Sequence, residues 1–286
     1  SRGQMIPHEA SSLLQSTEEL PIPPSRLAEA RILLLVSHMF SQFSDITWQF
    51  CLVLFLAAFA DYESLFLVST YGLVSGLSVC LFGSTTGQYI DSTNRLRAAR
   101  LFILSQNVCV LVATYCCYTL LSVSSAVESE IEDAESAPSS AERNTFVLWL
   151  RSRLKGIPTD AFSVFILVAI HILGSFETLL SRGFKVAIER DWIVVMSKTA
   201  AAGRNSELGT STEKKWLSST NVAMKQIDLS CKVLAPSVAG FVIAAFDSSG
   251  GANHGSDLSG AAILVGLLNV SAIVVEYVCT ALIYSM

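Results

Sequence analysis

Four polar side chains interrupt an apolar segment near the N-terminus, at positions that a helix would bring together. They are His38, Gln42, Asp45 and Gln49, separated by steps of four, three and four residues. At about 100° per residue, these steps keep all four on one narrow stripe of a helix. An imidazole, a carboxylate and two amide oxygens suit a borderline divalent metal such as Fe(II). The stripe indicates either a metal site or a polar seam that is hydrogen-bonded to neighbouring helices.

A later apolar segment repeats this spacing with a different balance of charge. Its polar residues are Asn221, Lys225, Asp228 and Lys232. Asp228 stands three residues after one lysine and four before the other, so pairing within the helix could consume its charge. Two hypotheses stay open for Asp228: a structural ion pair, or a switch in which it exchanges a lysine for a substrate cation.

Between these two segments lies a third set of polar residues inside an apolar run. The set consists of His171, Glu177, Arg182 and Lys185. Charged side chains near the end of a membrane span mostly extend toward the interface or form salt bridges. We therefore expect a structural role for this set.

The composition shows what kind of element must position these side chains. Charged residues make up only 15% of the 286 residues, against about 25% in a soluble domain, and the mean hydropathy is +0.52. Apolar runs of about 20 residues suit a lipid bilayer. A net charge of −5 without a basic block argues against a nucleic-acid partner. No soluble-enzyme signature is present, so we predict an all-α membrane protein that is neither an enzyme nor dependent on a cofactor.

Six apolar runs are long enough to cross the membrane. They cover about 27–59, 64–89, 96–122, 159–195, 216–246 and 260–284. The remaining segments are predicted to be a disordered cytoplasmic tail (1–26), an acidic loop followed by an interfacial segment (123–158), and a polar loop (197–215). Basic residues flank alternate connections and are retained in the cytosol. This places the N-terminus and the 197–215 loop in the cytosol, and the acidic loop on the opposite side.

The second span carries two further patterns. Its glycines, at 72, 76, 83 and 87, predict a face for close helix packing. The stretch from Gly87 through Asp91 and Arg95 to Arg97 resembles the Gly-x-x-x-Asp-x-x-x-Arg-x-Arg pattern that follows the second span of major facilitator transporters. A carboxylate and arginines at a cytoplasmic helix end can form an ion-pair latch that breaks when the helices rock.

Several blocks, in the same order along the chain, resemble the ferroportin family of iron exporters. The blocks are Tyr71-Gly-Leu-Val, Gly83-x-x-x-Gly87-Gln-Tyr-Ile-Asp91, Ser105-Gln-Asn-Val, Glu189-Arg-Asp-Trp-Ile-Val-Val195, Ile227-Asp-Leu-Ser-Cys-Lys-Val-Leu-Ala-Pro236 and Val275-Glu-Tyr277. The resemblance covers all six spans, and the Ile-Asp-Leu-Ser-Cys-Lys form is closer to plant or other non-animal members than to animal ones.

The resemblance implies a six-helix bundle that forms the N-terminal lobe of a major facilitator transporter. Such a transporter exports Fe(II) by alternating access, coupled to protons, and Co(II), Ni(II) and Zn(II) are further candidate cargoes. Asp45 and Asp228 fall on metal-ligand positions of the family. Gln49 replaces a histidine of animal members, so three alternatives stay open: the site is altered, it is tuned to another metal, or His38 completes it.

The resemblance also implies a cytoplasmic gate, a missing half and a choice of membranes. Asp91, Arg95, Arg190 and Asp191 fall on the gate positions. The family's second lobe has no counterpart here, so we expect a C-terminal lobe as a partner of this chain within the lipid bilayer. The target is the plasma membrane or a vacuolar or plastid membrane.

Two other functions remain open at this stage. The polar residues of spans one and five could instead serve a carrier of an organic solute, through Gln42, Gln49, Asn221 and Lys225. Alternatively, the chain could be a half-length membrane subunit that binds a full transporter without transporting by itself.

Overall fold

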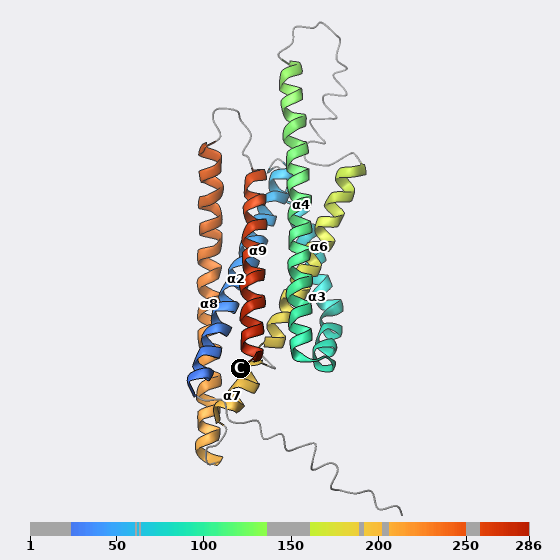
Figure 1. Ribbon diagram of the computed structural model, residues 1–286. Coiled ribbons are helices and arrows are strands. Elements are labelled where there is room, and N and C mark those ends of the chain that lie inside the picture. Colours follow the sequence, from blue (N-terminus) through green and yellow to red (C-terminus); the bar gives the residue numbers. More distant parts are fainter. Residues whose placement is uncertain are drawn as a thin grey trace, which may run out of the picture.

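Long helices dominate the protein, whose structure is a computed structural model (Figure 1). It describes residues 24–60, 62, 64–135, 161–188, 192–201, 206–249 and 258–285. The helices in these ranges are α2 (Pro24–Phe59), α3 (Phe66–Ser92), α4 (Arg95–Glu135), α6 (Ala161–Ala187), α7 (Ile193–Ala201), α8 (Ser206–Ser249) and α9 (Leu258–Ser285). All except α7 contain a stretch long and apolar enough to cross a membrane. The predicted all-α bundle of six spans is confirmed.

The long helices alternate in direction along the bundle. The start of α2 and the end of α9 lie at the same end, as an even number of spans requires (Figure 1). Helix α2 packs against α8 and α9, α4 packs against α6 and α9, and α3 packs against α6. The central helices are therefore α2, α4, α6 and α9, with α3 and α8 packed at the periphery.

Three predicted boundaries differ from the structure. Helix α4 continues to Glu135, into the acidic stretch that was predicted as a loop. Alanine and glutamate both have a high helix propensity, and the negative charge of glutamate does not prevent a helix. Most of the predicted 197–215 loop is helical too, since α7 reaches Ala201 and α8 begins at Ser206. The predicted fourth span divides into α6 and α7, with a π-helical turn at Ile188. Of the predicted tail (1–26), residues 24–26 begin α2, whereas residues 1–23 and the predicted interfacial segment lie outside the described residues.

Close packing of α3 uses glycines of its neighbour rather than its own. A Cβ atom added at any of the four α3 glycines would meet nothing within 4 Å. A Cβ at Gly174 of α6 would lie 2.8 Å from the Tyr71 ring, and one at Gly183 would lie 2.7 Å from Thr86. The prediction of a packing face on the α3 glycines is therefore wrong within the described residues, because the small residues that admit close approach belong to α6.

A polar layer separates two apolar clusters in the interior. One cluster contains Trp48, Leu52 and Phe55 of α2 with parts of α4, α6 and α9. The other contains Ala30 and Leu34 of α2 with parts of α4, α6 and α7. Buried polar residues of α2, α4, α6, α8 and α9 occupy chain positions between the two. This order places the polar residues at mid-span, where lipid cannot satisfy them and protein partners must do so.

Candidate metal site

The polar layer is built from five helices. Its buried members include Ser41, His38 and Asp45 of α2, Gln106 and Asn107 of α4, Glu177 of α6, Asp228 of α8, and Asn269 and Glu276 of α9. Ionisable groups at this depth are costly and usually face a bundle interior or an aqueous cavity. The layer is therefore the candidate site.

Asp45 is held by two neutral donors. The Gln106 amide donates a 2.5 Å hydrogen bond to Oδ1, and the Ser181 hydroxyl donates a 2.5 Å hydrogen bond to Oδ2. Only 5% of Asp45 is exposed. Neither partner carries a charge that would neutralise the carboxylate, so Asp45 retains its attraction for a cation.

Asp228 is held by two basic groups from other helices. His38 Nε2 of α2 lies 2.9 Å from Oδ1, and Lys185 Nζ of α6 lies 2.5 Å from Oδ2. Lys225, on the same helix as Asp228, is more distant at 3.6 Å and mostly exposed. The dominant ion pair therefore crosses between helices, whereas the sequence had suggested pairing within one helix.

Gln49 lies at the edge of the layer, next to a carboxyl group that we had expected to be structural. Gln49 is exposed, whereas Glu177 is completely buried. The side chains of Gln49 and Trp48 interact with the Glu177 carboxyl group. Thr178 donates a 3.2 Å hydrogen bond to Oε2, and Oε1 has no hydrogen-bond donor within the described part of the chain. Glu177 Oε1 is thus an under-satisfied acceptor in the same part of the layer as Gln49.

Helices α4 and α9 contribute amides and one more carboxyl group. Asn269 donates a 2.7 Å hydrogen bond from its side chain to Asn107 Oδ1. Glu276 interacts with the Ser41 hydroxyl and, through its charge, with Asp45. Among the described residues, Gln106 Oε1, Asn269 Oδ1 and Glu276 Oε2 are buried without a donor. Buried acceptors are normally satisfied, so these oxygens indicate a place for a bound cation or water.

The electrostatics of the layer are acidic around Asp45. The carboxyl groups of Glu177 and Glu276 lie within electrostatic reach of Asp45, and so does the ammonium group of Lys185. Carboxylate and amide oxygens with one imidazole form a donor set suited to divalent metals from the hard to the borderline class.

The four predicted ligands do not form one cluster in this conformation. His38 and Asp228 contact each other, whereas Asp45 contacts Gln106 and Ser181. No group of three or more histidine, cysteine or acidic side chains within the described ranges is arranged to hold a metal ion. The assignment of Asp45, Asp228, Gln49 and His38 as ligands stays a prediction. In this conformation the ligands belong to two half-sites, one around Asp228 with His38 and the other around Asp45.

The predicted gate is only partly described. Asp91 is exposed near the end of α3, and Arg95 begins α4, although its side chain is outside the described part. Arg190 and Asp191 also fall outside the described residues. The gate therefore stays a prediction.

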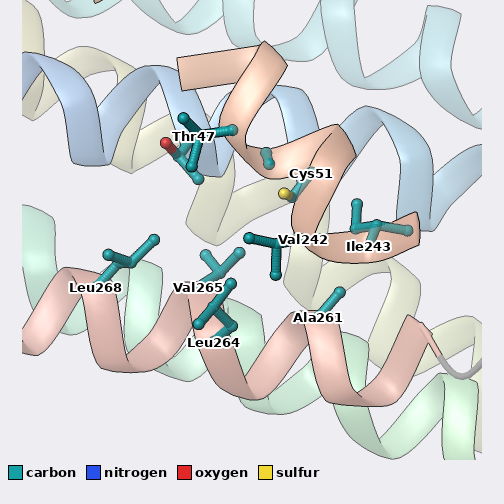
Figure 2. A pocket seen from close by; sticks show the side chains of 10 residues that line it. Thr47, Cys51, Val242, Ile243, Ala261, Leu264, Val265 and Leu268 are labelled. Atoms are coloured by element: carbon teal, nitrogen blue, oxygen red, sulfur yellow. The ribbon is translucent and has the colours of Figure 1, made fainter. Parts of the chain in front are cut away.

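A small pocket elsewhere in the bundle is apolar. It lies between α2, α8 and α9, and Figure 2 shows Thr47, Cys51, Val242 and Leu264 on its wall. The Thr47 hydroxyl donates to the Phe43 carbonyl oxygen at 2.7 Å, within its own helix. The pocket thus offers few polar ligands and is not part of the candidate metal site.

Comparison with known families identifies the chain. A sequence model of the Ferroportin1 (FPN1) family matches residues 28–286. The chain belongs to the ferroportin family. The matched range contains all six spans and every residue of the polar layer, so the geometry above describes the interior of a ferroportin-family lobe.

Curated ferroportin-family relatives match over most of this chain and about a third of their own length. Solute carrier family 40 member 2 of Arabidopsis thaliana is 28% identical over 222 residues, which are 77% of this chain and 35% of the relative. Human ferroportin is 25% identical over 252 residues, 88% of this chain and 35% of the relative. The rice solute carrier family 40 member 1 is 27% identical over 210 residues, 73% of this chain and 35% of the relative.

Several members of the polar layer were missed or undervalued in the sequence. Glu276 and Gln106 both lie inside blocks that resemble ferroportins. Glu276 is also an acidic residue in the middle of a membrane span, and such a residue indicates a functional site by default. Glu177 and Lys185 were assigned structural roles because they were counted with the charges of the span end. Their spacing of eight residues, two helical turns, shows that they share a face of α6.

Proposed function

We propose that this chain is the N-terminal lobe of a ferroportin-like exporter that moves Fe(II) out of the cytosol by alternating access. Co(II), Ni(II) and Zn(II) are further candidate cargoes, and export is coupled to protons. A C-terminal lobe completes the transporter, and the N-terminus is cytosolic. The plasma membrane, the vacuole and the plastid are the candidate locations.

The observation that carries this proposal is the pair of buried carboxylates on different helices. Asp45 of α2 and Asp228 of α8 are both at most 5% exposed, and each is held by partners from other helices. Buried intramembrane carboxylates are expensive unless they bind or exchange a partner. A metal ion can take the place of the present partners, because carboxylate, imidazole and amide groups all act as ligands.

The arrangement suggests how each group acts on the ion. Asp45 supplies an anionic oxygen that is already oriented by Gln106 and Ser181. His38 supplies a nitrogen ligand that favours borderline metals over Mg²⁺ or Ca²⁺. Gln49 is a neutral and weaker ligand, so an ion bound near it dissociates more readily than from a histidine site.

Radioactive iron efflux tests the proposal. Cells that express the full-length gene product are loaded with ⁵⁵Fe(II), and the release of label is followed with time. Asp45→Ala and Asp228→Ala should each abolish efflux, whereas Ser237→Ala, an exposed residue that bonds only its own helix, should not change it. Wild-type efflux in Asp45→Ala would contradict the site assignment.

The same variants separate a metal exporter from a carrier of an organic solute. A metal exporter should bind Co(II) with a heat, measured by calorimetry, that disappears in Asp45→Ala. An organic-solute carrier should show no such heat.

A further inference from the structure

Lys185 occupies a place that a metal ion would need in order to bind Asp228. Its Nζ lies 2.5 Å from Oδ2, while His38 Nε2 lies 2.9 Å from Oδ1. Both carboxylate oxygens and the imidazole nitrogen are therefore engaged. A metal ion can coordinate Asp228 and His38 only after these contacts break.

The ammonium group also acts on the second carboxylate. The charge of Lys185 interacts with Asp45, so one cation on α6 serves an acid on α2 and an acid on α8. A divalent ion between the half-sites would provide the same interaction with twice the charge. The metal ion and the ammonium group would repel each other if both contacted Asp228, so their simultaneous presence is unfavourable.

We propose that Lys185 is a tethered counter-cation of the empty site, and that its ammonium group and the exported metal ion occupy Asp228 in turn. The inference rests on the proposed function, because it names the group that the metal has to displace. Lys185 lowers the affinity for the metal and drives its release when the ammonium group returns to Asp228.

The burial of the three partners fits such an exchange. The side chains of Asp228 and His38 are each 6% exposed, whereas that of Lys185 is 27% exposed. Lysine carries its charge on a flexible four-carbon stem. The ligands are thus fixed, and the ammonium group has a route out. Lys185 also stands in the last turn of α6, where the helix dipole favours a cation in the resting position.

Lys225 provides a matched control on the same carboxylate. Its Nζ lies 3.6 Å from Asp228 Oδ2, but 72% of its side chain is exposed. Exposed ion pairs contribute little because water screens them. Removing the charge of Lys225 should therefore leave metal binding unchanged, although Lys225 and Lys185 approach the same oxygen.

Calorimetric titration with Co(II) tests the exchange on the full chain in lipid nanodiscs. Lys185→Met removes the charge and keeps the length of the side chain, so the dissociation constant for Co(II) should fall about ten-fold, within the usual range of coupling between ligands. Lys185→Arg and Lys225→Met should bind as the wild type does. Asp228→Ala should lose this binding. If Lys185 only held Asp228 in place, Lys185→Met would instead leave Co(II) binding equal or weaker, because the carboxylate would lose the contact that positions it.

The outcomes separate this inference from the proposed function. Co(II) binding that depends on Asp228 but is equal or weaker in Lys185→Met overturns the tethered cation and leaves the exporter standing. If Co(II) does not bind, or if its binding is unchanged in Asp45→Ala and in Asp228→Ala, the inference and the proposed function are both wrong.

A second measurement uses the wild-type protein and does not depend on the folding of any variant. Binding is reciprocal, so the metal must weaken the hold of Asp228 on Lys185 as much as Lys185 weakens the metal. Reductive methylation with formaldehyde, read by mass spectrometry, should modify Lys185 faster when Co(II) is present, with Lys225 unchanged. Equal labelling of Lys185 with and without Co(II) overturns the proposal.

Discussion

Ser181 of α6 donates a 2.5 Å hydrogen bond to Asp45 of α2, and this contact links the two helices within the polar layer. One turn before Ser181 on α6, Glu177 lies beside Gln49, which is one turn after Asp45 on α2. One turn after Ser181, the ammonium group of Lys185 interacts with Asp45 through its charge. Because residues four apart share a helix face, α6 presents a carboxyl, a hydroxyl and an ammonium group in line along the polar stripe of α2.

Ser181→Ala should destabilise the protein by about 1 kcal/mol, the usual scale of a hydrogen bond between membrane helices. The physical reason is the loss of one of the two donors to the buried Asp45 carboxylate. Thermal unfolding in detergent, followed by circular dichroism, measures the change. Ser237→Ala removes a hydroxyl that bonds only the Val233 carbonyl oxygen of its own helix, and it should unfold at the wild-type temperature. Equal shifts in both variants would contradict the assigned contact.

Glu177→Gln should weaken Co(II) binding about ten-fold, because it replaces a carboxyl group that can lose its proton to a bound cation with a neutral amide that cannot. Stability should be retained, since glutamine has the same shape and the buried carboxyl group is under-satisfied. Glu213→Gln, about four turns before Asp228 on α8, serves as the control for loss of an acid and should bind normally. Normal binding in Glu177→Gln would exclude Glu177 from the site.

Gly174→Ala should destabilise the contact between α3 and α6 by about 1–3 kcal/mol, the cost of overpacking. Its Cβ would lie 2.8 Å from the Tyr71 ring, which is also hydrogen-bonded to the Gly174 carbonyl oxygen. Gly76→Ala is the matched control, because its Cβ meets nothing within 4 Å and alanine favours the helix. Thermal unfolding should show a lower midpoint for the first variant and an equal or higher one for the second. The reverse order would show that α3 packs differently.

Gln49→His should tighten the binding of Co(II) and Zn(II) more than that of Mn(II). An imidazole next to Asp45 adds a nitrogen ligand, which borderline metals prefer to an amide oxygen. Gln49 is exposed, so the larger ring can be accommodated without overpacking. Competition titrations with the three metals measure the order of their affinities in the wild type and in the variant. An unchanged preference would mean that Gln49 does not reach the metal.

The spans and the stripe of α2 were predictable because both depend on one helix at a time. Apolar length identifies a membrane span, and the spacing of Asp45 and Gln49 places them on one face whatever surrounds them. The partner opposite that face depends on how separate helices pack, which periodicity does not encode. This is why Lys185, 43 residues away from Asp228 in the chain, was not recognised as its ion-pair partner.

Two local errors have a similar origin. The end of α4 was predicted as a loop from its charge, although glutamate and alanine are good helix formers. Glu177 was grouped with the charges of the span end, although it stands at the middle of the predicted 159–195 span, and it is completely buried. In both cases charge was read as a sign of exposure to water, whereas the helix and its burial are set by propensity and by the neighbouring helices.

Gln49 is exposed and Asp45, one helical turn away, is buried. In the proposed exporter, an ion at Gln49 would keep most of its hydration shell, because the amide supplies one ligand and the exposed side leaves room for water. The same ion would lose that water one turn along α2, where Asp45 and its neighbours would supply oxygens instead. Dehydration is therefore spread over about 6 Å of α2, the rise of four residues, rather than concentrated in a single step. In the proposed exporter, such a graded exchange of water for protein oxygens would lower the kinetic barrier to both capture and release.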